Sequence, residues 1–430
     1  MTAIDQDTMD RALAEVHRRI DDDELVELAL ALGNLDSPTG REGAASDHVF
    51  GFLEEAGLAP RRLALYPDRP NVVARLPGAD DGRSLLFNSH LDTTIAPEEF
   101  LTTPHADAPE YHQAWRDGRF LIGNGIVNNK GVMATWLIAC KAIKASGVAL
   151  AGDLVMTSVV GEIGVEPVDE FQPPEYIAKE AGARYVVNRG VTADFALVAE
   201  GTDFALCWVE AGKAFFKINV LGKEPPLYTP YVPRPTSLEE SPNAIVRATK
   251  VIQAIEEWAY DYEQAHTYEC AGGTVVPKVS VGAVRSGVPY KITKTPSICQ
   301  LFLDVRITPE QSHADVKREL SEVLARTSVP VEIEPFVYRR GYEAKGVEPL
   351  VGCVEAAHRR VFGSEPGRPV IPITSMWRDS NVFNEVGIPT VVYGPGASVG
   401  GGNFAMEIDA LTQAARVYAA IALEVCGVAV

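Results

Sequence analysis

The sequence places a histidine and two glutamates at the ends of three apolar runs. "SLLFNSHLDTT" delivers His90, "TSVVGEIG" delivers Glu162 and "FALVAEGTD" delivers Glu200. Asp92 follows the histidine by two residues, so in an extended segment its carboxylate can accept the second imidazole N–H while the first nitrogen holds a metal. Each glutamate alone fits the start of a solvated loop at least as well. Three such strand ends together indicate a metal site.

Two patterns of predicted secondary structure divide the chain. From about residue 22 to residue 200, short β-rich runs alternate with helical patterns, which favours a parallel sheet with helices on both faces and ligands at the carboxyl ends of its strands. Around residue 211 the pattern changes to that of an α+β block of roughly 115 residues. We therefore expect a catalytic domain formed by residues 1–210 and 329–430, with residues 211–328 inserted.

The composition favours a small-molecule ligand. The chain has 430 residues and a formal net charge of −19, and this charge argues against nucleic acid or an anionic membrane as its main partner. No run approaches the ~20 apolar residues that span a bilayer, and the charged N-terminal stretch has no apolar signal region. We expect a cytoplasmic protein.

Several stretches carry a resemblance to a known family. "SHLDTT" resembles the family's "GHxDxVP", "GNGIVNNKGVMA" its "GRGxxDxKGGxA", "GEIG" its "DEExG" and "VAEGT" its "xGEPT". "SPNAI" and "SMWRDSNVFNEVGIPTVVYGPG" resemble further motifs in the same order. The family is that of the metallopeptidases and deacylases that include glutamate carboxypeptidase, acetylornithine deacetylase, succinyl-diaminopimelate desuccinylase and aminoacylase.

The resemblance covers nearly the whole chain and implies an α/β fold class. The expected architecture is a zinc-peptidase-like α/β/α catalytic domain with an inserted ferredoxin-like α+β domain, which acts as a lid and as a dimerisation domain. A homodimer or a higher homo-oligomer through this lid is therefore expected. By position, the family pattern makes His90 and Glu200 ligands of the first metal, Asp92 the partner that orients the histidine, and Glu162 a ligand of the second metal.

The sequence departs from the family pattern at central positions. Asn128 stands at the bridging aspartate, and Gly161 stands at the general-base glutamate. The final histidine ligand falls on Asn403, and the lid histidine is absent from a stretch that holds Tyr228. Asn129, next to the bridging position, is interpreted as loop chemistry at the start of a helix.

These departures predict one divalent ion per chain. A bridging ligand between two divalent ions about 3.5–4 Å apart must offset their repulsion with negative charge, and the neutral amide of Asn128 supplies none. Glu162 and Glu200 supply two negative charges, which suits one ion. With His90 and amide oxygen, the donor set is harder than a typical zinc set, so Mn²⁺ is favoured and Zn²⁺ is an alternative.

The missing general base leaves two hypotheses. The chain could be a non-catalytic relative that binds a ligand in the old cleft. Alternatively, Glu162 could act as the catalytic base and activate a water on the metal, whose pKa the ion lowers. We favour the enzyme, because a site without function would not need the combination of His90, Asp92, Glu162 and Glu200.

Arginines on the lid and nearby loops bind a substrate carboxylate in the family. Arg306 in "LDVRI" matches the family's "DxR", Arg340 (or Arg339) lies in "YRRGY", and Arg378 lies in "MWRDS". A surface charge or an ion pair is the commoner role for a single arginine. The predicted substrate-binding residues are Arg306, Arg340, Arg378, Tyr228 and Asn403.

The favoured substrate is a small aromatic amine. The family includes a divergent aminohydrolase that removes the amino group of 5-nitroanthranilate, in which the nitro group stores the charge of the intermediate. A second metal matters less for that reaction, and the substitutions here look like that requirement. Trp377, Tyr228 and Tyr231 could hold a ring between them, although ordinary packing explains each alone. An N-acyl amino acid or dipeptide hydrolase remains an alternative.

Overall fold

The computed structural model describes residues 6–95, 99, 102–104, 106–169, 174–396 and 404–429. By the contacts within the chain, these residues form two units. The first unit comprises Met1–Trp208, Ala344–Pro369 and Arg378–Val430, and the second comprises Val209–Glu343 and Val370–Trp377. The second unit extends past residue 328 because β14 (Val331–Arg339) pairs with β9 (Gly212–Leu221) in its sheet.

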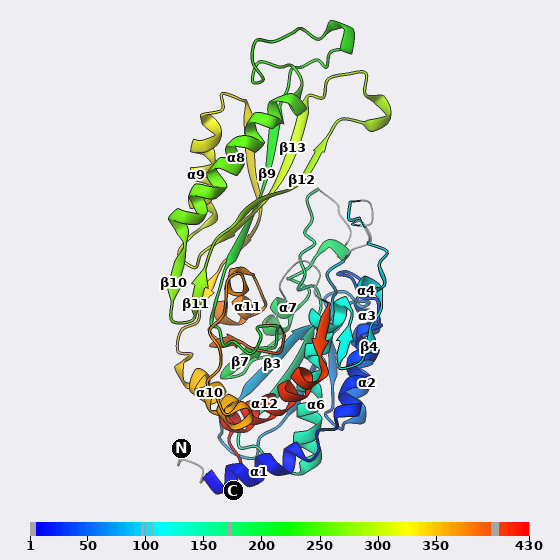
Figure 1. Ribbon diagram of the computed structural model, residues 1–430, viewed down its shortest axis with the longest axis vertical. Helices are drawn as coiled ribbons and strands as arrows, with labels where there is room; N and C mark the ends of the chain where they lie inside the picture. Colours follow the sequence, from blue (N-terminus) through cyan, green and yellow to red (C-terminus); the bar gives the residue numbers. More distant parts are fainter. Residues whose placement is uncertain are drawn as a thin grey trace. The chain divides into compact units, whose positions relative to one another are not determined.

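A six-stranded sheet forms the centre of the first unit (Figure 1). Its order is β1 (Arg61–Leu63), β2 (Asn71–Leu76), β6 (Leu154–Val159), β3 (Leu85–His90), β7 (Phe195–Val198) and β16 (Thr390–Val392). The last four strands are parallel, whereas β1 and β2 are antiparallel additions. Strands β3 and β6 are buried along their whole length, as expected for strands covered on both faces.

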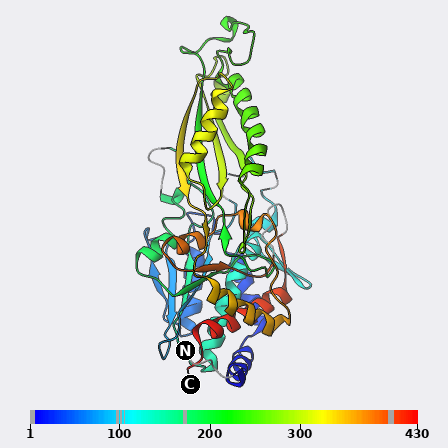
Figure 2. The same ribbon diagram turned by 90° about the vertical axis from the view of Figure 1, so that its left-hand side faces the viewer.

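Helices cover both faces of this sheet (Figure 2). Phe87, Met156 and Leu197, one on each of three neighbouring strands, are buried in a large apolar core together with residues of the long helices of the unit. These helices are α1 (Gln6–His17), α2 (Asp22–Gly33), α3 (Gly43–Glu55), α6 (Lys130–Ser146), α10 (Glu348–Phe362) and α12 (Ile408–Cys426). The short helices α7 (Ala183–Asn188) and α11 (Ser380–Glu385) contact each other, and α11 also contacts β7 and β16.

Smaller elements complete the first unit and its junctions. A three-stranded sheet has the order β17 (Ala405–Glu407), β5 (Phe120–Ile122) and β4 (Trp115–Asp117). The short helices α4 (Pro109–His112) and α5 (Asn124–Val127) and a 3-10 turn at Pro174–Tyr176 belong to the first unit, whereas the 3-10 turns at Thr229–Tyr231, Pro289–Lys291 and Ile373–Ser375 belong to the second.

The second unit has the β-α-β-β-α-β order of a ferredoxin-like domain. Its antiparallel sheet has the order β12 (Val279–Ser286), β13 (Ile298–Ile307), β9 and β14. Helices α8 (Ala244–His266) and α9 (His313–Ala325) lie side by side against this sheet (Figure 2). Alternate residues of β9 and β13, such as Ile218 and Leu301, are fully buried beneath the helices. Two small pairs, β8 (Val209–Glu210) with β15 (Tyr342–Glu343) and β10 (Tyr268–Cys270) with β11 (Gly273–Val275), complete the unit.

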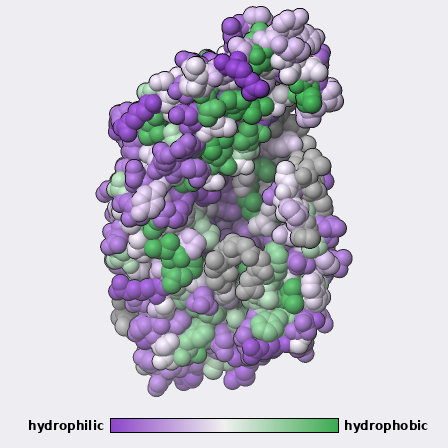
Figure 3. All heavy atoms as spheres, turned by 45° about the horizontal axis from the view of Figure 1, so that its top comes forward, coloured by the Kyte–Doolittle hydropathy of each residue, from purple (hydrophilic) through white to green (hydrophobic). Residues whose placement is uncertain are grey.

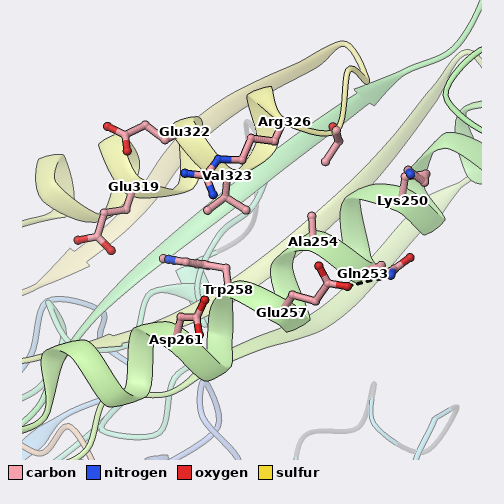
Figure 4. A pocket seen from close by; sticks show the side chains of 11 residues that line it. Lys250, Gln253, Ala254, Glu257, Trp258, Asp261, Glu319, Glu322, Val323 and Arg326 are labelled. Atoms are coloured by element: carbon pink, nitrogen blue, oxygen red, sulfur yellow. Dashed lines mark hydrogen bonds between the residues drawn. The ribbon is translucent and has the colours of Figure 1, made fainter.

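The surface offers little that competes with the sheet edge as a functional site. The face drawn in Figure 3 is mostly hydrophilic, in keeping with the net charge of −19. No helix in the described part of the chain is long and apolar enough to cross a bilayer. A hollow between α8 and α9 is lined by charges of both signs (Figure 4), including Lys250, Glu257, Glu319 and Arg326. It contains none of the predicted site residues.

Candidate metal centre

The three residues predicted from strand ends lie together in the first unit. Strand β3 lies between β6 and β7, and the three run parallel, so their carboxyl ends meet at one edge of the sheet (Figure 1). His90 ends β3, and its Nε2 lies 3.4 Å from Glu200 Oε1 and 3.9 Å from Glu162 Oε2. The buried edge of the sheet therefore brings one imidazole and two carboxylates to one point.

Asn128 supplies a fourth donor at this point. It follows α5 and precedes α6, and its Oδ1 lies 3.0 Å from His90 Nε2. The other ring nitrogen, Nδ1, lies 3.0 Å from the backbone oxygen of Asp92. Nδ1 carries the proton of the neutral ring, because a carbonyl can only accept, and so the lone pair of Nε2 faces three oxygen atoms.

A divalent cation fits this donor set. A lone pair that faces oxygen acceptors is repelled by them unless a cation or a proton lies between. Ligand atoms about 2.1 Å from a shared ion are separated by roughly 3–3.5 Å, close to the spacings around His90 Nε2. In the described part of the chain, no group of three or more His, Cys, Asp or Glu side chains alone forms a metal site. The set around His90 reaches four donors only with the amide of Asn128.

Asp92 fixes the geometry around the histidine. Its carboxylate lies 3.4 Å from His90 Nδ1 and accepts hydrogen bonds from the backbone N–H groups of Glu162 (3.0 Å) and Ile163 (2.9 Å) and from Thr39 Oγ1 (2.7 Å). Burial would raise the pKa of Asp92, but its hydrogen bonds and the charges of His90 and Lys179 lower it to about 2. The ionised carboxylate thus ties the end of β3 to the loop after β6.

The carboxylates act in turn on the histidine. Burial lowers the pKa of His90, but the hydrogen bond to Asp92 and the charges of the neighbouring carboxylates outweigh burial and raise it to about 10. Without a metal, the site thus attracts positive charge at Nε2, the nitrogen that faces the oxygen donors. This is the electrostatic environment in which a bound cation is stabilised.

Lys179 belongs to the site, although no motif predicted it. Its side chain is 2% exposed, and its Nζ lies 2.8 Å from Glu162 Oε1. Burial raises the pKa of Glu162, but the charge of Lys179 and that of His90 lower it overall. The lysine follows the loop that the "GEIG" stretch opens, and nothing in its local sequence distinguishes it from a surface lysine.

Asp379 and Arg378 bring further charge to the site. Both side chains are buried, and Asp379 Oδ2 accepts a hydrogen bond of 3.0 Å from Asn88 Nδ2. Burial is the largest influence on the pKa of Asp379, which is raised to about 7. Burial also raises the pKa of Glu200, against the charges of His90 and Arg378. Asp379 stands where "RDS" matches the family's "TDA", so the sequence contained a signal for it.

Asn129 lies at the start of a helix, as expected, but its side chain does not cap that helix. It occupies the position before α6. Its Nδ2 instead donates to the backbone oxygen of Ala199, 2.9 Å away. Ala199 precedes Glu200, so Asn129 holds the end of β7 in place.

The predicted substrate-binding residues are divided between the two units. Arg378 lies in the first unit, whereas Arg306, Arg340 and Tyr228 lie in the second. Arg306 donates through Nη2 to Asp304 Oδ2, 2.9 Å away in the same strand, so an ion pair within β13 accounts for it locally. Asn403 lies outside the described residues.

Two other predicted substrate-binding residues of the second unit, Arg340 and Tyr228, each form a cation–ring contact with a neighbour. Arg340 lies over the ring of Tyr342, with 5.1 Å between Cζ and the ring centroid. Tyr228 is half exposed, and Lys294 Nζ lies 5.0 Å from the centroid of its ring. A role for these residues in substrate binding stays a prediction.

The central strands of the main sheet are parallel, and imidazole, carboxylate and amide groups meet at their carboxyl ends. Together with the ferredoxin-like insertion, this arrangement is typical of a class of metal-dependent hydrolases. The model of a known protein family, Peptidase family M20/M25/M40, matches residues 86–424. The chain belongs to this family. The resemblance stated from the motifs and the predicted fold class are thereby confirmed. The chain is an enzyme of the hydrolase class.

Related proteins cover nearly the whole chain. N-formyl-4-amino-5-aminomethyl-2-methylpyrimidine deformylase from Bacillus subtilis is 26% identical over 432 residues, which cover 90% of this chain and 91% of that protein. The structure of human carnosine dipeptidase 1 covers 96% of this chain and 98% of its own, with a TM-score of 0.68 and 17% identity. A dinuclear metal binding peptidase from Bacillus subtilis covers 94% and 98%, with a TM-score of 0.60 and 16% identity.

Proposed function

We propose that this enzyme cleaves a C–N bond of a small, carboxylate-bearing substrate by adding water, with the help of one bound divalent ion. The observation that carries the proposal is the convergence of His90 Nε2 with oxygens of Asn128, Glu162 and Glu200, within 3.0 to 3.9 Å. An imidazole, two carboxylates and an amide at one buried point form a metal-binding set, and hydrolysis is the chemistry of the family.

His90, Asn128 and Glu200 would hold the ion, and Glu162, the most distant of the four, would face the attacking water. Mn²⁺ is favoured over Zn²⁺ because most of the donors are oxygens. When bound, the ion makes water more acidic and polarises the bond to be cleaved. Asp92 acts as a positioning residue: it keeps the proton of the ring on Nδ1 and so leaves Nε2 free to bind.

Glu162 is the proposed catalytic base. One of its oxygens, Oε1, pairs with Lys179, which leaves Oε2 directed toward the side of His90 Nε2. Oε2 takes a proton from the attacking water and passes it to the departing nitrogen. In a deamination the new bond joins the water oxygen to a ring carbon, the C–N bond breaks, and the nitrogen leaves as ammonia.

The proposed substrate is a small aromatic molecule with a nitrogen substituent. An aromatic amine such as 5-nitroanthranilate is the first candidate, because the nitro group carries the developing charge and so reduces the need for a second cation. Arg378, the predicted carboxylate-binding arginine of the first unit, is the candidate partner for the carboxylate of such a substrate.

Deformylation is the second candidate. The relative of 26% identity is named for removal of an N-formyl group from an aminomethylpyrimidine, which is also C–N hydrolysis on a ring-bearing molecule. The same proton transfers by Glu162 would then release formate and an amine. An N-acyl amino acid or a dipeptide is the third candidate.

Product analysis separates these candidates. The chain is freed of metal, reconstituted with Mn²⁺ or Zn²⁺, and incubated with 5-nitroanthranilate, N-formyl aromatic amines, N-acyl amino acids and dipeptides. We expect ammonia or formate to be released with metal present and not without it. Glu162→Gln should lower kcat at least about 100-fold, whereas Glu180→Gln, on a neighbouring segment, should not. Full activity of Glu162→Gln would refute the assignment of the base.

The assembly and the location stay predictions. A homodimer or higher homo-oligomer through the second unit is expected from the family, and sedimentation of the purified chain tests it. A cytoplasmic location is likewise expected.

A further inference from the structure

We propose that the Lys179 ammonium takes the place of a second divalent cation at this site and thereby limits the chain to one ion. The inference deepens the proposed function, because it rests on a divalent ion being bound at His90. It concerns a residue that the family motifs do not include.

Lys179 is placed where its charge acts on every carboxylate of the site. Its Nζ lies 2.8 Å from Glu162 Oε1, and its side chain is 2% exposed. Its positive charge acts on four buried carboxyl groups of the site: Asp92, Glu162, Glu200 and Asp379. A surface lysine screened by water would not act on four groups at once. The ammonium therefore does the electrostatic work that a second cation would do.

The segment that carries Lys179 packs against Gly161, the position of the family's general-base glutamate. A Cβ at residue 161 would lie 2.5 Å from the backbone oxygen of Ala178, and one at Gly182 would lie 1.9 Å from that of Val160. The absence of a side chain at residue 161 is thus what allows the segment to lie here. The absence of a side chain at residue 161 and the buried position of Lys179 therefore depend on the same packing.

Further hydrogen bonds hold this segment in position. Arg69 donates through Nη1 to the backbone oxygen of Ile177, 2.6 Å away, and is itself fixed by a buried ion pair with Glu42. Asn71 Nδ2 donates to the backbone oxygen of Ala181, 2.8 Å away. The backbone on both sides of Lys179 is anchored, so its ammonium is a fixed charge and not a mobile one.

The balance of charge at the site accommodates one divalent ion. Four buried carboxyl groups, Asp92, Glu162, Glu200 and Asp379, lie at the site with two buried cations, Lys179 and Arg378. Among these six groups the negative charges exceed the positive charges by two. One divalent ion brings the site within one charge of neutrality, whereas two ions would leave a buried excess of positive charge, which is costly.

Metal stoichiometry tests the inference without any assay of activity. The full chain and its variants are freed of metal and titrated with Mn²⁺ by calorimetry, and bound metal is counted by elemental analysis after dialysis. The variants are Lys179→Met, which removes the charge, Lys179→Arg, which keeps it, Asn128→Asp, and the double variant Asn128→Asp/Lys179→Met. Lys141→Met is the matched control, because Lys141 pairs with Glu24 on α2.

We expect one ion per chain in the wild type, in Lys179→Arg, in Asn128→Asp and in Lys141→Met. Lys179→Met should bind Mn²⁺ at least about tenfold more tightly, because a nearby positive charge is gone. The double variant should bind two ions. Two ions in the wild type or in Asn128→Asp alone, or an unchanged affinity in Lys179→Met, would overturn the inference.

These outcomes are separable from those of the proposed function. A wild type that binds one ion, with the expected response of Lys179→Met, supports the role of the lysine even if no C–N substrate is turned over. Metal-dependent hydrolysis with two bound ions would leave the proposed function intact and refute the role of Lys179. If Lys179→Met does not fold, the stoichiometries of the wild type, Lys179→Arg and Asn128→Asp still decide.

Discussion

Gly161 shows at the scale of a single residue how the backbone limits the chemistry of the site. It has φ +67, in the left-handed region, and its α-carbon faces the backbone of Ala178 at a distance that admits no side chain. A glutamate at residue 161 would displace the segment that carries Lys179. The packing at residue 161 is therefore in keeping with the proposal that Glu162 acts as the base.

Replacement of this glycine should destabilise the protein for two reasons. Gly161→Ala adds a methyl group 2.5 Å from the Ala178 oxygen at a positive φ, and we expect the free energy of unfolding to fall by about 2 kcal/mol or more. Gly190→Ala is the control: Gly190 has φ +82, but nothing lies within 4 Å of its added Cβ, so its cost should be about 1 kcal/mol. Equal losses in urea unfolding would contradict the role given to Ala178.

At the scale of elements, a buried histidine joins α10 to the end of β16. His358 on α10 has its Nδ1 2.6 Å from the Tyr393 Oη, and its ring stacks on Phe362. Nδ1 and the tyrosine hydroxyl form a buried hydrogen bond, and burial lowers the pKa of His358 below its usual 6.5. The contact between helix and sheet thus depends on an uncharged histidine.

This contact predicts a loss of stability in mild acid. Below about pH 6.5 the unfolded chain binds a proton at His358 that the folded chain excludes, so the free energy of unfolding falls as pH falls. His358→Asn keeps an acceptor for Tyr393 but cannot be protonated, and its stability should fall less between about pH 7 and about pH 5. Denaturant unfolding at both values measures this difference. A parallel fall in both proteins would show that His358 does not contribute.

The positions of the strands decide which site residues could be predicted from the sequence. His90, Glu162 and Glu200 were predicted as a group because each lies at the end of an apolar strand or within three residues after it. Parallel neighbouring strands bring such ends together. Lys179 was missed because its place depends on how the segment around Gly182 packs against β6, which no local pattern encodes. Asn129 lies at the start of α6, as predicted, but its amide donates to the distant carbonyl of Ala199, a partner that no local pattern encodes.

For the whole molecule, the change from alternating helices and strands to an antiparallel pattern predicted an insertion at residues 211–328. The second unit of the structure comprises Val209–Glu343 and Val370–Trp377, and it includes β14, which pairs with β9 across more than 100 residues. Arg306 lies in the second unit and forms an ion pair with Asp304. To bind a substrate carboxylate, its guanidinium would have to be shared with Asp304 or released from it. The residues of the proposed metal site, His90, Asn128, Glu162 and Glu200, all lie in the first unit.

The most direct measurement follows hydrolysis as metal is added back. The metal-free chain is titrated with Mn²⁺, and product release from the best C–N substrate is measured at each ratio of ion to chain. We predict no turnover without metal and a linear rise that saturates at one ion per chain. Full activity in the metal-free chain, or saturation at two ions per chain, would contradict the account.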